Sequence, residues 1–442
     1  MHIGTKRIRF AGVALLSGVL ATTGCGILDV SNPNNLVEEN LATTQAANAV
    51  VNGALSLAAV AISDVWQAYE IAGDGLTWIG SRDGWREIDI GALSNTENEF
   101  LDVTYPELAQ ARWMADQAVD LVKVHVDEGL TQFNATLAKG YLIAGTVYTV
   151  IGEVQEDMTF SDKLEAGAPV GEAGMLAVFD DAVSRLDQAV TLARAAGNSE
   201  IETRALAMRA RAKFAKGIRQ KIKPTPNTAN PLVQDAGAVA DAQAALALMG
   251  GTDWRWQFQY SASTITNQLA SWINSRAENQ VGSDYVSVDP AAIKTITGIV
   301  LMDPLTNAPD REITRRVNEF FVEGQIYQPL TIIDERQMHM IIAEDALARG
   351  DNAAFTDAIN DIRVTLDGVT AYSGQIPAID MLRHERRVNI FLTGQRLADM
   401  YRFGVVDDVW LPTSDTQQNP GKLLPISITE IRANCHLNGL GC

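Results

Sequence analysis

The sequence lacks the local patterns that most enzymes use for catalysis. Its five histidines are scattered, and no two of them have the His-Glu-x-x-His spacing of a zinc site. It also has no Gly-x-Ser-x-Gly elbow, phosphate-binding loop or Gly-x-Gly-x-x-Gly run. We therefore expect a protein that is not an enzyme and that has neither a cofactor nor a bound metal. The histidines are His2, His125, His339, His384 and His436.

Neighbouring acidic residues leave one kind of catalysis open. Glycosidases need two carboxylates that are close in space, which a sequence does not reveal. Adjacent acids are more often helix caps and solvated faces. A surface glycoside hydrolase therefore stays as an alternative. The adjacent acids are Glu38-Glu39, Asp180-Asp181 and Asp407-Asp408.

Basic residues are also scarce. The chain has 35 Lys and Arg against 54 Asp and Glu, a formal net charge of −19. It has no basic patch interleaved with aromatic residues, so we expect no nucleic-acid partner. Beyond the N-terminus, no stretch approaches the roughly 20 apolar residues needed to cross a bilayer. The mature protein is thus expected to be anchored to a membrane rather than inserted through it.

The N-terminus has the organisation of a bacterial lipoprotein signal. Residues 1–24 have a basic start, a short apolar run from Phe10 to Ala21, and small residues before Cys25. We predict cleavage before Cys25 and acylation of this cysteine, followed by a polar tether over residues 25–35. The alternatives are an ordinary secretory signal or a cysteine present by chance.

Only two other cysteines exist, Cys435 and Cys442. In an exported protein these two either form a disulfide across a short loop or stay as free thiols. A metal site that includes His436 would have too few ligands nearby.

The remaining chain reads as mainly α-helical. Apolar residues recur at helical spacing over residues 36–71, where two helices separated near residues 61–63 are expected, and over residues 105–127. Paired helices over about 135–250 and 332–404 resemble tetratricopeptide hairpins. Glycine-, proline- and aromatic-rich residues predict irregular regions at 73–98 and 250–309. The predicted later helices are 202–219, 236–249, 332–349 and 352–366.

A charged segment near the C-terminus, residues 384–404, predicts one core helix. It is apolar on two sides yet rich in charge, and buried charges persist only in pairs. We expect Glu385 and Arg396 on one side of this helix, and Asp399 beside Arg396 and Arg402. Gly394 would allow a bend or a close approach in the middle.

These residues carry a resemblance to a known family. Glu385-Arg386-Arg387, Gly394-Gln395-Arg396, Asp399-Met400, Arg402 and Gly404 resemble the C-terminal signature of the SusD/RagB family. Leu423-Leu424-Pro425-Ile426, Glu430-Ile431 and Asn434 are similar to a second signature of that family. The resemblance implies a SusD-like fold over one domain, residues 36–442. It also implies an outer-membrane lipoprotein that captures a glycan or similar nutrient for a SusC-like, TonB-dependent transporter.

Sugar rings need exposed aromatic faces and planar polar side chains. Within the first irregular region Trp78, Arg82, Asp83 and Trp85, with Tyr69 just upstream, supply both. The alternative is that the tryptophans only pack the loop onto the helices. In the second region Trp254 and Trp256 are either a binding platform or part of a half-buried strand.

One further function stays open. A helical-repeat adaptor in the cell envelope, without a small ligand, would have buried tryptophans. The sequence does not identify the nutrient, which is a glycan, a peptide or another polymer.

Overall fold

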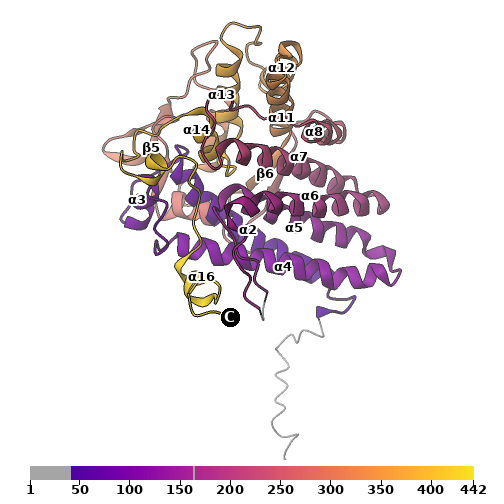
Figure 1. Cartoon of the computed structure of the whole chain (residues 1–442). Coiled ribbons are helices and arrows are strands. Elements are labelled where there is room, and N and C mark those ends of the chain that lie inside the picture. The colour runs from indigo at the N-terminus through magenta and orange to yellow at the C-terminus, as the bar shows by residue number, and fades with distance from the viewer. Residues whose placement is uncertain (1–40, 163–164) are drawn as a thin grey trace, which may run out of the picture.

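The computed structural model describes residues 41–162 and 165–442. The predicted signal, Cys25 and the tether lie outside the described residues. The first half of the fold is a stack of long helices that run side by side (Figure 1). They are α2 (Ala47–Ala72), α4 (Leu101–Asp127), α5 (Asn134–Val154), α6 (Gly171–Ala195), α7 (Ser199–Ile222) and α8 (Ala236–Met249), with a 3-10 turn η1 (Thr131–Phe133) before α5.

Small residues let these helices approach closely. A Cβ on Gly145 would lie 2.5 Å from Leu186, and one on Gly152 would lie 2.6 Å from Phe179. Both glycines of α5 therefore accept side chains of α6 against their backbone. At the turn into α7, the Asn198 side chain accepts a hydrogen bond from the Ile201 amide and caps the helix. The predicted helical hairpins are confirmed in this half.

Helix α2 corrects two expectations. It is one continuous helix, because residues 61–63 contain no glycine or proline that would break it. The Ser63 hydroxyl donates to the Val60 carbonyl, so this buried polar group has a partner within the helix. It is also long and apolar enough to cross a bilayer, contrary to the sequence-based expectation. However, 61% of its most apolar window is buried in the fold, so it serves here as a core helix.

The second half contains shorter elements. These are α10 (Arg311–Phe320), β6 (Leu330–Asp334), α11 (Glu335–Ala348), α12 (Asn352–Asn360), a π-helical turn η3 (Asp361–Leu366), α13 (Ala378–Asn389) and α14 (Arg396–Phe403). The predicted helix over 332–349 begins later than expected, because residues 332–334 belong to β6. Asp334 ends this strand and its side chain accepts the Gln337 amide hydrogen bond that starts α11.

The two irregular regions contain short elements that pair with one another or with β6. They are β1 (Leu76–Trp78), α3 (Asp83–Asp89), β2 (Arg255–Phe258), α9 (Gln268–Ala270), the π turn η2 (Ser271–Ser275), β3 (Asn279–Val281), β4 (Val286–Asp289) and β5 (Ala292–Ile299). Antiparallel pairs join β1 to β3, β2 to β6 and β4 to β5. The β1–β3 pair brings residues 201 to 205 positions apart into register, with Trp78 opposite Asn279. The prediction of a loop over residues 73–98 is therefore wrong in part, because this region contains β1 and α3.

The predicted single helix over 384–404 is also wrong, because the chain breaks between α13 and α14. Gly394 has a left-handed φ of 70°, and Leu392 has a φ of 58°. The Gly394 amide donates to Glu70 Oε1 at 2.8 Å, and a Cβ at Gly394 would lie 2.3 Å from the Trp66 ring. The glycine thus allows both the turn and the close contact with α2.

The C-terminal segment closes against the start of the helical stack. Leu424 exchanges backbone hydrogen bonds with Val154 and Glu156 at the end of α5. After the short α15 (Asp415–Gln418), helix α16 (Ile428–Ala433) is held to α4 because Asp102 accepts from the Thr429 amide and hydroxyl. Cys435 and Cys442 are joined by a disulfide.

The turn at Gly394 gives a stability prediction. We expect Gly394→Ala to lower the free energy of unfolding by about 2–4 kcal/mol, because alanine adds strain at a positive φ and a clash with Trp66. Gly53→Ala is the control, since Gly53 lies inside α2 with open space at its Cβ, and this change should be neutral or stabilising by about 0.5–1 kcal/mol. Urea denaturation measures both values. Equal effects of the two substitutions would contradict the assignment.

Candidate ligand-binding site

Four buried charged groups at the centre of the molecule position the elements around the site. Asp399 of α14 accepts from Arg386 Nε at 2.6 Å and from Arg402 Nε at 2.8 Å. Both arginines also contact Glu344 of α11. Burial opposes the ionisation of Asp399, but the two guanidiniums outweigh it and hold the pKa of this carboxyl below its ordinary value. The sequence analysis expected Asp399 beside both Arg396 and Arg402, and of these two pairs the one with Arg402 is present.

Glu385 and Arg396 were expected on one side of a single helix. This expectation is wrong, because the chain break places them on separate helices and turns them toward other segments. Arg396 Nε donates to Asp74 Oδ1 at 2.6 Å, directly after α2. Arg387 reaches the same carboxylate at 3.2 Å. Glu385 instead binds Arg363 at 2.7 Å. The charged C-terminal segment therefore anchors the irregular region that begins at residue 73.

Within this region, the predicted binding residues separate into buried and exposed groups. Tyr69 and Trp85 are 0% and 1% exposed, so neither presents the open ring face that stacking on a sugar requires. Trp85 stacks on Phe100, with ring centroids 3.7 Å apart, and meets the edge of Trp272. For Trp85 the packing alternative holds, because its ring packs against Phe100 and Trp272. Tyr69 is a buried core residue of α2.

The other three residues of that prediction lie nearer the surface. Trp78 is half-buried in β1, and its backbone amide donates to Asp89. Arg82 and Asp83 are exposed, and Arg82 pairs with Glu99 at 3.3 Å. Glu278, from the second irregular region, accepts from the backbone amides of Ser81 and Arg82. The two irregular regions thus form one surface.

A cleft of about 580 Å³ opens beside this surface, and we call it the amide cleft. Strand β3, strand β5 and helix α10 form its walls. Apolar side chains and the half-exposed Phe321 ring line part of it. Its volume and mixed lining are typical of a small-molecule site. The residues that the argument uses are Ile79, Asn279, Gln280, Asn318 and Phe321.

Two residues that line this cleft have buried amide atoms without hydrogen-bond partners among the described residues. Asn279 is 1% exposed, yet neither its side-chain nitrogen nor its oxygen has a partner among the described residues. Gln280 Oε1 is also buried and unpartnered. A buried amide without partners costs about 1–3 kcal/mol, so a folded protein rarely keeps one without a reason. An amide that offers both a donor and an acceptor is suited to adjacent sugar hydroxyls.

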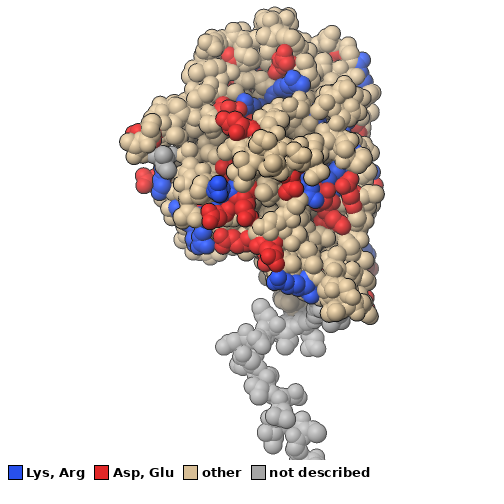
Figure 2. Space-filling model, turned by 60° about the vertical axis from the view of Figure 1, so that its left-hand side comes forward, with Lys and Arg blue, Asp and Glu red and all other residues tan. Residues whose placement is uncertain are grey.

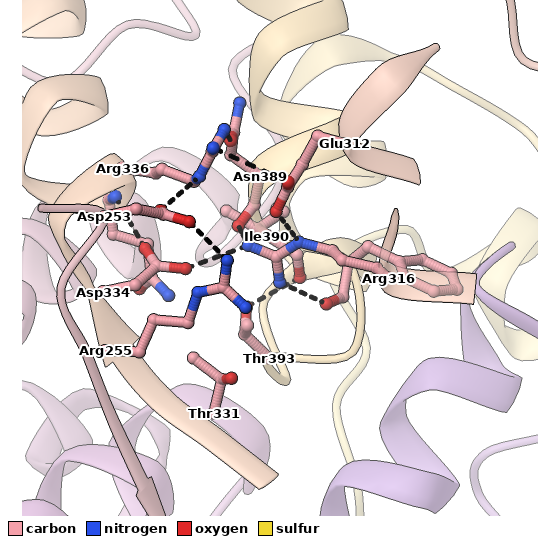
Figure 3. Close-up of polar contacts among 12 residues, drawn as sticks. Asp253, Arg255, Glu312, Arg316, Thr331, Asp334, Arg336, Asn389, Ile390 and Thr393 are labelled. Atoms are coloured by element: carbon pink, nitrogen blue, oxygen red, sulfur yellow. Dashed lines mark hydrogen bonds and ion pairs between the residues drawn. The ribbon is translucent and has the colours of Figure 1, made fainter. Parts of the chain in front are cut away.

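A second cleft, of about 440 Å³, lies along α10 and contains many arginines. Arg316 binds Glu312 at 2.6 Å and Asp334 at 2.9 Å, and it also donates to the carbonyls of Asn389 and Phe391 (Figure 3). Arg255 contacts Asp253 and Glu319. Each of these arginines already has carboxylate partners. The arrangement therefore serves to join α10, β2, β6 and the turn after α13.

The aromatic residues of β2 fit the half-buried-strand alternative. Trp256 and Phe258 are 5% and 3% exposed, and Trp254 is half-buried. Trp254 also exchanges hydrogen bonds with Glu335, through its backbone amide and carbonyl. The rings of Trp254 and Trp256 do not line the amide cleft, so neither of these two forms an open platform there.

One buried group of side chains has the composition of a metal site. Asp303, Asp310 and His384 place their ligand atoms within 4.8 Å of one another. However, Arg363 donates to Asp303 at 2.6 Å and His384 lies 3.0 Å from Asp310. A guanidinium at one carboxylate competes with a cation for the same oxygen. This arrangement fits a structural network better than a metal centre.

The sequence analysis missed Asn279 and Gln280. The only local signal is an Asn-Gln pair shortly after Trp272, in a region predicted to be irregular. Their importance comes from the pairing of β3 with β1, which the sequence does not reveal. Trp272, which is half-exposed with Arg276 at 4.5 Å from its ring, was also not among the predicted binding residues.

No protein-family model and no curated protein matches the sequence. Solved structures do match the fold. A SusD superfamily protein from Parabacteroides distasonis superposes with a TM-score of 0.60 at 12% identity, over 89% of this chain and 98% of that chain. A SusD homolog from Bacteroides thetaiotaomicron gives 0.59 at 11% identity, over 88% and 95%. Surface glycan-binding protein A from Bacteroides uniformis gives 0.56 at 12% identity, over 88% and 98%. The expected SusD-like, mainly α-helical fold is confirmed.

The arginine network gives a pH prediction. Burial would raise the pKa of Glu312, but Arg316, Arg315 and Arg336 lower it to about 2 from 4.5. Ionised Glu312 therefore stabilises the fold fully above about pH 5, and this contribution is lost as the pH falls toward 2. Glu312→Gln should cost about 3 kcal/mol at pH 7 and progressively less below pH 4.5.

Urea denaturation between pH 7 and pH 3 measures this difference. Glu128→Gln, at an exposed position after α4, is the control and should change stability by less than about 0.5 kcal/mol. A cost for Glu312→Gln that stays constant over this pH range would contradict the lowered pKa.

Proposed function

We propose that this chain, which has the SusD-like fold, is a cell-surface protein that binds a glycan or similar oligomeric nutrient in the amide cleft. The observation that carries the proposal is the buried, unpartnered Asn279 amide that lines this cleft. Two proteins of similar fold, a SusD-like carbohydrate-binding protein and a surface glycan-binding protein, support the same class of ligand.

The cleft suggests how a sugar would be held. The Asn279 amide and the Gln280 carbonyl would exchange hydrogen bonds with ring hydroxyls. Phe321 would cover an apolar C–H face of the ring, and Asn318 stands exposed on α10. Trp78, Arg82 and Asp83 lie on the neighbouring β1–α3 surface and would contact further units of an oligomer.

The wider setting of the proposal comes from the sequence. Cys25 would carry the acyl groups that anchor the protein to the outer membrane. The resemblance of the C-terminal signatures to the SusD/RagB family supports a SusC-like, TonB-dependent transporter as the partner that receives the nutrient. In this arrangement the protein passes on its ligand unchanged.

Capture without chemistry fits the lining of the clefts. The amide cleft is lined by a single carboxylate, Glu323, and the arginine-lined cleft by Glu319. Glycoside hydrolysis uses two carboxylates about 5–10 Å apart across the ligand. A hydrolase would have to place its second acid elsewhere.

The amide cleft gives a prediction that separates binding from stability. Asn279→Ala should weaken oligosaccharide binding by about tenfold or more, because two hydrogen bonds to the ligand are lost. The same change should leave the melting temperature unchanged or raise it, because unpartnered polar atoms leave the core. Tryptophan fluorescence titration with oligosaccharide and peptide panels, and thermal unfolding, measure the two effects.

Two further variants complete this experiment. Asn274→Ala should lower the melting temperature, since that amide donates to the Phe320 and Gln325 carbonyls at 2.8 Å. Gln110→Ala, exposed on α4, should change neither quantity. Shortened products in the mixtures would identify a hydrolase. If no oligosaccharide or peptide binds to the wild type, the adaptor alternative is favoured.

A further inference from the structure

A third cleft lies away from the amide cleft, between α2, α5, the first turns of α7 and strand β2, and we call it the cationic cleft. Its volume is about 480 Å³. The helices α2, α5 and α7 that border it belong to the stacked half of the molecule (Figure 1). Its lining includes Lys139, Arg204, Trp256, Asn52 and Gln259.

The charge of this cleft is opposite to that of the molecule. The chain has a net charge of −19, and acidic side chains gather on the face drawn in Figure 2. The cationic cleft nevertheless has two cations and one carboxylate, Glu200. Glu200 pairs with Arg204, and its own side chain is 66% exposed. Solubility accounts for the negative charge of the whole protein but not for a cleft with more cations than carboxylates, so the cleft requires another explanation.

Neither cation is fully satisfied. Lys139 Nζ donates to the neutral Asn52 Oδ1 at 2.7 Å and forms no ion pair within the described part of the chain. Arg204 Nε is buried and has no hydrogen-bond partner there. Burial, and then the nearby Arg204, lower the pKa of Lys139, as expected for a cation without a full counter-charge. In the arginine-lined cleft, by comparison, Arg255 and Arg316 each contact two carboxylates, whereas among the described residues Arg204 contacts only Glu200 and Lys139 contacts none.

The remaining lining matches a sugar ring. Leu55 supplies half-exposed apolar surface, and the buried Leu142 and Ile143 lie beneath it. The buried ring of Trp256 also borders the cleft, with its centroid 5.6 Å from the Arg204 guanidinium. Gln259 is an exposed amide at the edge. An apolar wall, planar amides and convergent cations together suit a ring that also carries a negative group.

We propose that the cationic cleft is a second ligand site, which binds an acidic sugar unit with its carboxylate or sulfate group between Lys139 and Arg204. The site is separate from the amide cleft and goes beyond the function proposed above. It selects the substrate by charge: a glycan that contains uronic acid or sulfated sugars would be retained in preference to a neutral one.

Calorimetric titration of the mature protein tests this site with three ligands: an oligogalacturonate, its carboxyl-reduced neutral counterpart, and a sulfated oligosaccharide. We expect saturable binding of at least one acidic ligand, about tenfold or more tighter than the neutral one. Lys139→Gln and Arg204→Gln should each weaken this binding by about tenfold, and added salt should weaken it further.

Matched controls remove the same charges elsewhere. Lys123→Gln on α4 and Arg432→Gln on α16 alter exposed ion pairs and should bind the acidic ligand as the wild type does. Asn279→Ala should also keep this binding, while losing ligands of the amide cleft. Thermal unfolding of each variant establishes that it is folded.

Several results would overturn the inference. These are equal affinity for the neutral and acidic ligands, equal losses in the control variants, or no binding of either acidic ligand. Loss of acidic-ligand binding in Asn279→Ala alone would assign the acidic sugar to the amide cleft, so that the proposed function would stand without the second site. If inorganic sulfate at millimolar concentration displaced the acidic sugar completely, the cleft would be a simple anion site, and the inference of a sugar site would be wrong.

Discussion

The fold depends on the carboxylate of Asp399, which lies between two arginines with Glu344 beside them, all four fully buried. Removing water from charges costs several kcal/mol per ion, and only good geometry repays it. This geometry requires α11, α13 and α14 to meet at one place, because each contributes at least one of the charges. The loss of any one partner would leave an uncompensated charge in the core.

The same constraint extends from the core to the ligand surface. The turn between α13 and α14 places Arg396 against Asp74, and the Gly394 amide against Glu70 of α2. Arg211 of α7 also donates to the Thr393 carbonyl in this turn. Burial raises the pKa of Glu70 to about 8, so at neutral pH its carboxyl is mostly protonated and adds no unpaired charge. The turn thereby connects the helical stack to the region that begins at residue 73 and contains β1.

The sequence was informative where one segment determines its own structure. Helical spacing predicted α4 to α8 closely, because their apolar stripes and caps are local. It failed at residues 384–404, where the pattern is helical but Gly394 meets Trp66 across more than 300 positions. The charged residues were recognised as paired, yet most of their partners lie on other segments. Asn279 could not be recognised at all, because its significance depends on an absent hydrogen bond and on the register between β3 and β1.

The buried charged groups at the centre of the core are well paired, whereas some polar groups elsewhere in the molecule are buried without partners. In the core, even guanidiniums such as Arg402 have carboxylate and carbonyl partners. Along the amide cleft and the cationic cleft, by contrast, the Asn279 amide and Arg204 Nε are buried without partners. Unpaired amides also occur in the core, at Gln67 of α2 and Gln155 after α5, so a missing partner does not by itself identify a binding residue. At Asn279 and Arg204 the unpaired group also lines a cleft, and this combination favours a ligand as the missing partner.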